Sequence, residues 1–258
     1  MHSGADLATL RLAMVSTGHR LHGNAGRMEN AMIPLILASA FFVGIHVFIS
    51  GTRLRDSLVA QVGEQGFRGL FSVLSLLGMV WMCWAYSRAP AFALWGKAHA
   101  FRPLALGLVL LAFLFVGIGL TTPSPTAVGG ESQLDEPEPA RGILRITRHP
   151  FLWGVAVWAF THLVLSGDAA SFVLFGALLL LALVGPGSID AKRQRAFGGK
   201  WGRFAAVTSN VPFTAIIEGR NVLRMEELGL WRIGVGLALY AVLLLSHRWL
   251  FGVSPFPL

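Results

Sequence analysis

The sequence has little charge and almost no cysteine. Charged residues make up 13% of the 258 residues, against 54% apolar residues, while a typical soluble domain carries about 25% charged residues. A chain of this composition cannot hide its apolar surface from water in a single core, so we expect an integral membrane protein. Cys83 is the only cysteine, which excludes an intrachain disulfide and a cysteine-based metal cluster.

Long apolar runs are what the sequence does have. A helix needs about 20 residues, at 1.5 Å each, to cross about 30 Å of hydrocarbon. The sequence predicts an all-α fold, a polytopic transmembrane bundle of about six helices in one domain, 32–258. We expect residues 1–31 to form an N-terminal extension that is either not translated or disordered. The predicted spans are 32–51, 69–86, 103–120, 150–166, 171–186 and 231–249.

The positive net charge of +8 indicates how the chain is oriented in the membrane and does not suggest a nucleic-acid partner. Most of the 21 Lys and Arg residues fall in the loops that follow the first, third and fifth spans. By the positive-inside rule these loops face the cytoplasm and both termini face outward. This pattern predicts a multi-pass protein of a bacterial inner membrane.

Two of these loops contain basic segments that could bind anions. If the end of the first is helical, Arg141, Arg145 and Arg148 share one face, which suits either lipid phosphates or an anionic group on a ligand. In the second loop, Trp201 and Phe204 recur at helical spacing among basic residues. That pattern predicts an amphipathic helix lying in the membrane interface.

Two histidines stand inside predicted spans without a charged partner in the same span. His46 lies in the first span and His162 in the fourth. Polar groups at such positions are costly, so the two imidazoles either form interhelical hydrogen bonds or share a ligand. The ligand that suits two neutral imidazoles is haem iron. His149 is a rival partner for His46, and His247 is expected at the membrane interface.

Several motifs resemble the NnrU family, which is named for an association with nitric oxide and nitrite metabolism and which includes zeta-carotene isomerase. The resemblance covers 32–258, and its motifs are Arg-His-Pro-Phe-Leu-Trp-Gly at 148–154, Ser-Asn-Val-Pro-Phe at 209–213, Gly-Arg-Asn at 219–221 and Trp-Leu-Phe-Gly-Val-Ser-Pro at 249–255.

That resemblance implies haem b bound through His46 and His162. His149 would then orient the site or replace a ligand, and Arg145 and Arg148 would meet the haem propionates. The implied partners are membrane lipid and either a polyene such as zeta-carotene or nitric oxide. If the chain is an enzyme, the resemblance implies a haem-dependent isomerase. The isomerase branch has a cysteine three residues before the second histidine, where this chain has Ala159.

Two alternatives remain open. The Arg-His-Pro motif also resembles membrane methyltransferases of the isoprenylcysteine type, which bind S-adenosylmethionine. This chain has Leu152, Trp201 and Phe204 where those enzymes carry tyrosines. The second alternative is a non-catalytic factor that assembles another membrane enzyme.

Overall fold

The computed structural model describes residues 31–50 and 52–256, and within them it is all-helical. The predicted fold class is confirmed. Five helices are long and apolar enough to cross a membrane, and a sixth, the 17-residue helix α4, is apolar but shorter. The extension predicted for residues 1–31 lies outside the described residues except for Ala31. The six apolar helices are Ala31–Ile49, α2 (Leu54–Arg88), α3 (Arg102–Thr121), α4 (Pro150–Ser166), α5 (Ala169–Phe197) and α8 (Leu230–Phe251).

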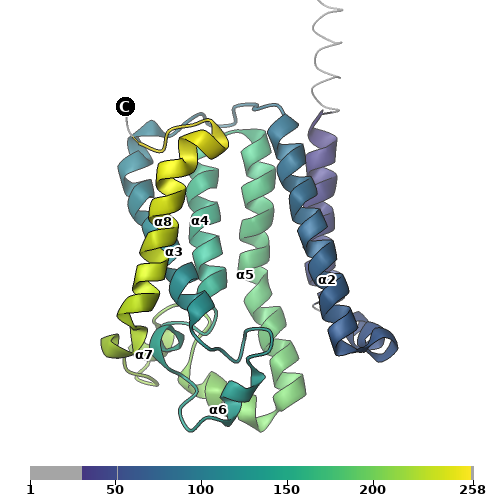
Figure 1. The fold of residues 1–258 in the computed structure, drawn as a ribbon, viewed down its shortest axis with the longest axis vertical. Helices are drawn as coiled ribbons and strands as arrows, with labels where there is room; N and C mark the ends of the chain where they lie inside the picture. The colour runs from purple at the N-terminus through teal and green to yellow at the C-terminus, as the bar shows by residue number, and fades with distance from the viewer. Residues whose placement is uncertain (1–30, 51, 257–258) are drawn as a thin grey trace, which may run out of the picture.

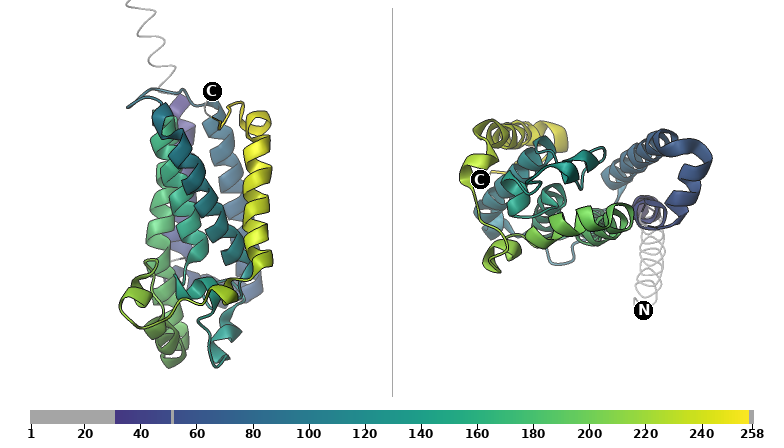
Figure 2. Two further views of the ribbon diagram at one scale, coloured as in Figure 1. Left: turned by 90° about the vertical axis from the view of Figure 1, so that its left-hand side faces the viewer. Right: turned by 90° about the horizontal axis from the view of Figure 1, so that it is seen from below.

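The six helices run side by side, so the bundle has two ends (Figures 1 and 2). We call one end the terminal face: it holds Ala31, the turn between α4 and α5, and the end of α8 at Phe251. We call the other end the basic face: it holds the beginning of α2, the loop between α3 and α4, and the loop between α5 and α8. Both described chain ends lie toward the terminal face, as the loop charges predicted.

The first span and α2 differ from the predicted boundaries near the basic face. The first span ends in a π-helical stretch, Ile45–Ser50. Helix α2 begins at Leu54, well before the predicted start at residue 69, but Gly63 breaks it with φ 74° and ψ 163°. Glycine tolerates this left-handed conformation. The residues before Gly63 therefore form a separate helical arm, which apolar periodicity alone did not reveal.

Close glycine contacts hold α3 to its neighbours. A Cβ on Gly117 of α3 would lie 2.5 Å from the Cα of Gly236 on α8, and one on Gly154 of α4 would lie 2.7 Å from the carbonyl oxygen of Ala112. Small residues let transmembrane helices pack backbone to backbone. Helix α3 consequently packs against both α4 and α8.

Helix α5 continues past Pro186, where the sequence predicted its end, and reaches Phe197. It is followed by α6 (Gly199–Val207), whose Trp201 and Phe204 are buried against Leu134, Ala140 and Leu144. The predicted amphipathic helix is therefore present, but its apolar face packs on the protein and not in the membrane interface. The short elements of this end are η3 (Glu131–Asp135), η4 (Gly142–Arg145), α7 (Thr214–Ile217) and η5 (Met225–Leu228).

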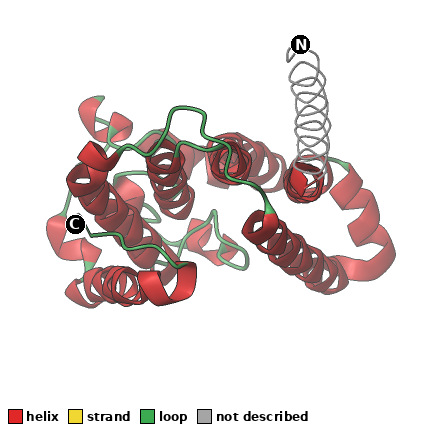
Figure 3. Cartoon of the chain, turned by 90° about the horizontal axis from the view of Figure 1, so that it is seen from above, coloured by secondary structure: helices red, strands yellow, loops and turns green. Residues whose placement is uncertain are grey.

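At the terminal face the loop after α2 crosses the α4–α5 turn (Figure 3). The amide of Leu94 donates to the carbonyl oxygen of Gly167 at 2.8 Å, and that of Ala169 donates to Phe92 at 2.8 Å. Gly167 has φ 64° and lies against the backbone of Gly96, so a side chain there would be strained and crowded. The short 3-10 helix η2 (His99–Phe101) then leads into α3.

Candidate functional site

His46 lies one turn before the basic end of the first span. Its Nδ1 is 2.7 Å from the carbonyl oxygen of Phe42, and its ring lies 4.5 Å from that of Phe42 and 5.1 Å from that of Phe71. Because a carbonyl can only accept, Nδ1 carries the proton and Nε2 presents a lone pair. The half-buried imidazole therefore has a metal-binding nitrogen that makes no hydrogen bond within the described residues.

His162 repeats this local arrangement near the terminal end of α4. Its Nδ1 donates to the carbonyl oxygen of Trp158 at 2.9 Å, and aromatic rings of Trp158 and Phe175 lie 4.8 and 5.1 Å away. A hydrogen bond at one ring nitrogen fixes the tautomer and orients the other nitrogen toward a metal. The predicted donor chemistry is thus present at both histidines.

The two histidines do not lie at one depth. His46 lies near the basic end of the first span, three residues before Ile49, whereas His162 lies near the terminal end of α4, four residues before Ser166. Each imidazole has the donor chemistry of an axial ligand, and the pairing of His46 with His162 stays a prediction.

His149, the rival ligand, is buried at the start of α4 and bonds to a carboxylate. Its Nε2 donates to Oδ1 of Asp190 at 2.7 Å, while Arg148 donates to Oδ2 of Asp190 through Nε at 2.9 Å and Nη2 at 2.7 Å. The third Arg148 nitrogen, Nη1, donates to the carbonyl oxygen of Thr208. This cluster joins the start of α4 to the end of α5.

Arg145 is 4% exposed and paired on every side. Its Nε and Nη2 donate to the two oxygens of Glu227, Nη1 donates to Asn221 and Nη2 also donates to Glu138. The hydrogen bond from Arg145 holds the pKa of Glu227 down at about 2, and that carboxylate in turn raises the pKa of Arg145. The expected helical face is also absent: only Gly142–Arg145 is helical here, as a 3-10 turn.

These contacts occupy the two arginines that we expected to bind the haem propionates. Arg145 and Arg148 donate to protein carboxylates with short, charge-assisted hydrogen bonds. A guanidinium that already has its carboxylate would have to give it up to bind a propionate. We therefore do not carry the propionate role of these two arginines into the function proposed below.

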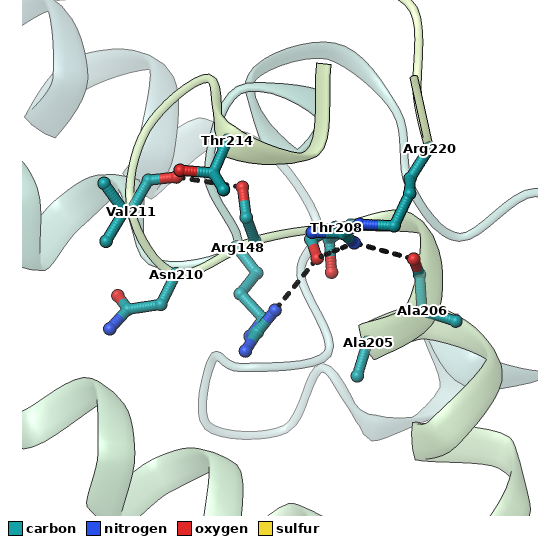
Figure 4. A pocket seen from close by; sticks show the side chains of 9 residues that line it. Arg148, Ala205, Ala206, Thr208, Asn210, Val211, Thr214 and Arg220 are labelled. Atoms are coloured by element: carbon teal, nitrogen blue, oxygen red, sulfur yellow. Dashed lines mark hydrogen bonds between the residues drawn. The ribbon is translucent and has the colours of Figure 1, made fainter. Parts of the chain in front are cut away.

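A hollow on the basic face lies beside Arg148 (Figure 4). It is open, measures about 560 Å³, and is lined largely by the segment that follows α6. Arg148 and Arg220 both donate to the carbonyl oxygen of Thr208, and Arg220 also donates to Ala206. The polar atoms of this hollow are thus largely occupied by one another.

The structure also bears on the methyltransferase alternative. Trp201 is 2% exposed and Phe204 is 0% exposed, both in a cluster of core residues. Side chains that fill a core are not presented to a cofactor. Arg148 and His149 of the Arg-His-Pro motif hold Asp190, as described above. Nothing in this arrangement favours S-adenosylmethionine.

Sequence reasoning missed several polar residues within the bundle. Tyr86 donates to Ser171 Oγ at 2.9 Å, and Ser171 donates to Asp168 at 2.8 Å, one helical turn from Phe175. The hydroxyls of Ser39 and Ser75 are buried without a partner in the described residues. Serine is common in transmembrane helices, so no sequence signal marked these positions. Asp168 could have been recognised as the N-cap of α5.

The chain matches the NnrU protein family over residues 34–255. It belongs to the NnrU family. Among curated relatives it is 29% identical to "15-cis-zeta-carotene isomerase, chloroplastic" of Arabidopsis thaliana over 208 residues, which is 77% of this chain and 53% of the relative. It is 33% identical to the Zea mays protein of the same name over 82 residues, 32% of this chain and 22% of the relative.

This NnrU protein therefore spans about half the length of the first of these relatives. No solved structure matches it. The resemblance in the Arg-His-Pro and C-terminal motifs is confirmed at the level of the family. The activity in the relatives' name belongs to those proteins.

Proposed function

We propose that this NnrU protein binds haem b inside the membrane through His162 and acts on a long apolar ligand of the conjugated polyene class. The observation that carries the proposal is the His162 imidazole, which is fixed at Nδ1 by the carbonyl of Trp158, lies among aromatic rings, and makes no hydrogen bond at Nε2 to any described residue. No three His, Cys, Asp or Glu side chains within the described residues are placed to hold a bare ion. In a haem, the porphyrin would supply four nitrogen ligands to the iron, so the protein would need to add only an imidazole.

The surroundings of His162 suit an apolar ligand. Trp158 and Phe175 enclose the imidazole, and the neighbouring core is made of Leu, Ala, Met and Phe side chains from the first span, α2, α4 and α5. The polyene class comes from the relatives named as zeta-carotene isomerases. The bound haem would supply an iron that polarises a conjugated system and lowers its barrier to rotation. The chain's own residues would hold the imidazole and exclude water.

We also infer that the membrane is the inner membrane of a bacterium, with the basic face in the cytoplasm. Lys and Arg are concentrated in the loops of this face. His162 would then lie near the outer side of the bilayer and His46 near the inner side. This proposal assigns haem binding to His162 and gives no role to His46.

An absorption spectrum of the purified protein, expressed with ample haem, tests the proposal. We expect a Soret band in the wild type and its loss or strong reduction in His162→Ala. The matched control is Thr161→Ala, which alters the neighbouring side chain and leaves the imidazole in place. A wild-type protein without Soret absorption would show that His162 is an ordinary hydrogen-bonding residue.

A further inference from the structure

We propose that the basic face carries a binding site for the headgroup of an anionic phospholipid, between the start of α2 and the end of α5. We call this site the α2–α5 seam. It consists of residues 53–68 at the start of α2, residues 191–197 at the end of α5, and Glu131 of η3. The inference is independent of the proposed haem function, because the seam lies at the opposite end of the bundle from His162.

Ion pairs bring the parts of the seam together. Arg193 of α5 donates from Nη1 to Oε1 of Glu131 at 2.7 Å, and Nη2 of Arg68 of α2 lies 3.7 Å from the same oxygen. Arg68 also donates from Nε to Glu64 at 2.9 Å. Arg55 donates to both oxygens of Glu64, at 2.6 and 2.8 Å. Two carboxylates thus gather three guanidinium groups from α2 and α5 at one place.

The seam has more positive than negative charge. It contains six basic and three acidic residues, which gives a net charge of +3. Lys192 is half-buried and makes no hydrogen bond or ion pair with a described residue. The seam can therefore accept a further anion. The basic residues are Arg53, Arg55, Arg68, Lys192, Arg193 and Arg195, and the acidic residues are Asp56, Glu64 and Glu131.

Arg193 also has a donor that needs an acceptor. Its side chain is 11% exposed, and its Nη2 donates to the carbonyl oxygen of Ala127 at 2.7 Å. Its Nε is buried and has no acceptor among the described residues. A buried donor without an acceptor is costly, and phosphate oxygens are strong acceptors for a guanidinium. The chemistry of the seam is therefore that of a phosphate site.

The position of the seam favours a phospholipid over a soluble phosphate. The seam lies on the basic face, where the long helices end (Figure 1). Directly beyond Arg68, α2 presents apolar side chains that are each more than half exposed, and these would contact acyl chains while the headgroup meets the arginines. They are Leu70, Val73, Leu76 and Leu77. Basic sites between transmembrane helices on the cytoplasmic side bind anionic headgroups in this way.

The same comparison excludes the arginines that the sequence suggested for lipid phosphates. Arg145 and Arg148 each have a carboxylate partner of their own. The seam, by contrast, keeps unpaired positive charge beside an apolar helix surface. We therefore place the headgroup at the seam and not at the Arg-His-Pro motif.

The test is a titration of the purified protein, in a neutral detergent, with phosphatidylglycerol, followed by native mass spectrometry. We expect phosphatidylglycerol to bind, phosphatidylcholine to bind far more weakly, and glycerol phosphate, which lacks acyl chains, to bind far more weakly too. Lys192→Gln and Arg193→Gln should each weaken binding of phosphatidylglycerol about fivefold, from the attraction of one cation near the membrane surface. Arg203→Gln is the matched control, because it removes one exposed cation from α6 on the same face, and it should bind as the wild type does.

Lys192→Gln keeps the test decisive even if Arg193→Gln does not fold, because Lys192 makes no hydrogen bond to a described residue. Equal binding of phosphatidylglycerol by Lys192→Gln and the wild type would overturn the proposal, as would an equal loss in Arg203→Gln. Equal affinity for phosphatidylcholine would show that the headgroup charge is not recognised. Equal affinity for glycerol phosphate would show that the ligand is a soluble phosphate and not a lipid.

Discussion

The basic face and the terminal half of the bundle use polar side chains in opposite ways. On the basic face, Arg145 pairs with Glu227 and Arg148 pairs with Asp190, so the two arginines of the recognised motifs both have a carboxylate partner. Near the terminal face, His162 and His247 each donate from Nδ1 to a backbone carbonyl, and their Nε2 atoms make no hydrogen bond within the part of the chain that the structure describes. The difference indicates that the charged motifs stabilise the fold, whereas the few uncharged imidazoles can bind a ligand.

The largest expected effect is a loss of stability when the ion pairs of Arg145 on the basic face are removed. Arg145→Met would remove the buried guanidinium that bonds Glu227, Glu138 and Asn221, and the two carboxylates would keep only the exposed Arg224 as a cation. Because this guanidinium is 4% exposed and makes short, charge-assisted hydrogen bonds, we expect a marked fall in the thermal unfolding midpoint of the protein in detergent. Arg141→Met, at an exposed position, is the control and should change the midpoint little. Equal effects of the two variants would show that the Arg145 cluster contributes no stability.

A smaller effect is expected on the pH dependence of stability, through the Glu227 carboxylate that Arg145 binds. The pKa of Glu227 falls from an ordinary value of 4.5 to about 2 in the folded protein, chiefly through its hydrogen bond from Arg145. A depressed folded-state pKa contributes stability that is present above pH 4.5 and is lost as pH falls toward 2. The full contribution is up to about 3 kcal/mol.

The unfolding free energies of the wild type and Glu227→Gln, measured from pH 7 to pH 2.5, test this expectation. The wild type should be more stable at neutral pH, and the difference should shrink as the medium becomes more acidic. A difference that stays constant with pH would mean that Glu227 does not act through its charge.

The smallest effect concerns the imidazole site. Ala159 lies three residues before His162 and is fully buried. Ala159→Cys places a thiol one helical turn from the imidazole, where its thiolate could compete for iron. We expect the ligand to change with the redox state of the iron, so the difference between the oxidised and reduced spectra should depart from the difference that the wild type shows. Ala159→Ser, of similar size, should behave as the wild type, and an identical change in both variants would point to packing instead of ligation.

The sequence predicted the helices more accurately than it predicted the site. Apolar run length located all six helices, because crossing a bilayer imposes that length on any sequence. It missed the bend at Gly63, which is set by one residue's backbone angles, and the extension of α5 beyond Pro186.

The sequence marked the polar residues of the bundle by type, but it did not show which side chains they contact. His46, His162, His149, Arg145 and Arg148 were all recognised as polar groups that require an explanation. Their partners, among them Asp190 and Glu227, are 41 and 82 residues away along the chain, and no local pattern encodes such distances. His247 was expected at the interface because it stands near the end of its span.

The most direct test of the contrast between the two regions is the haem content of two variants purified side by side. Glu227→Gln alters the charged network of the basic face, and His162→Ala removes the imidazole near the terminal face. Haem per protein, taken from the ratio of Soret to protein absorption, should match the wild type in Glu227→Gln and fall to a small fraction of it in His162→Ala. Loss of haem in Glu227→Gln with retention in His162→Ala would contradict the account and move the ligand site to the basic face.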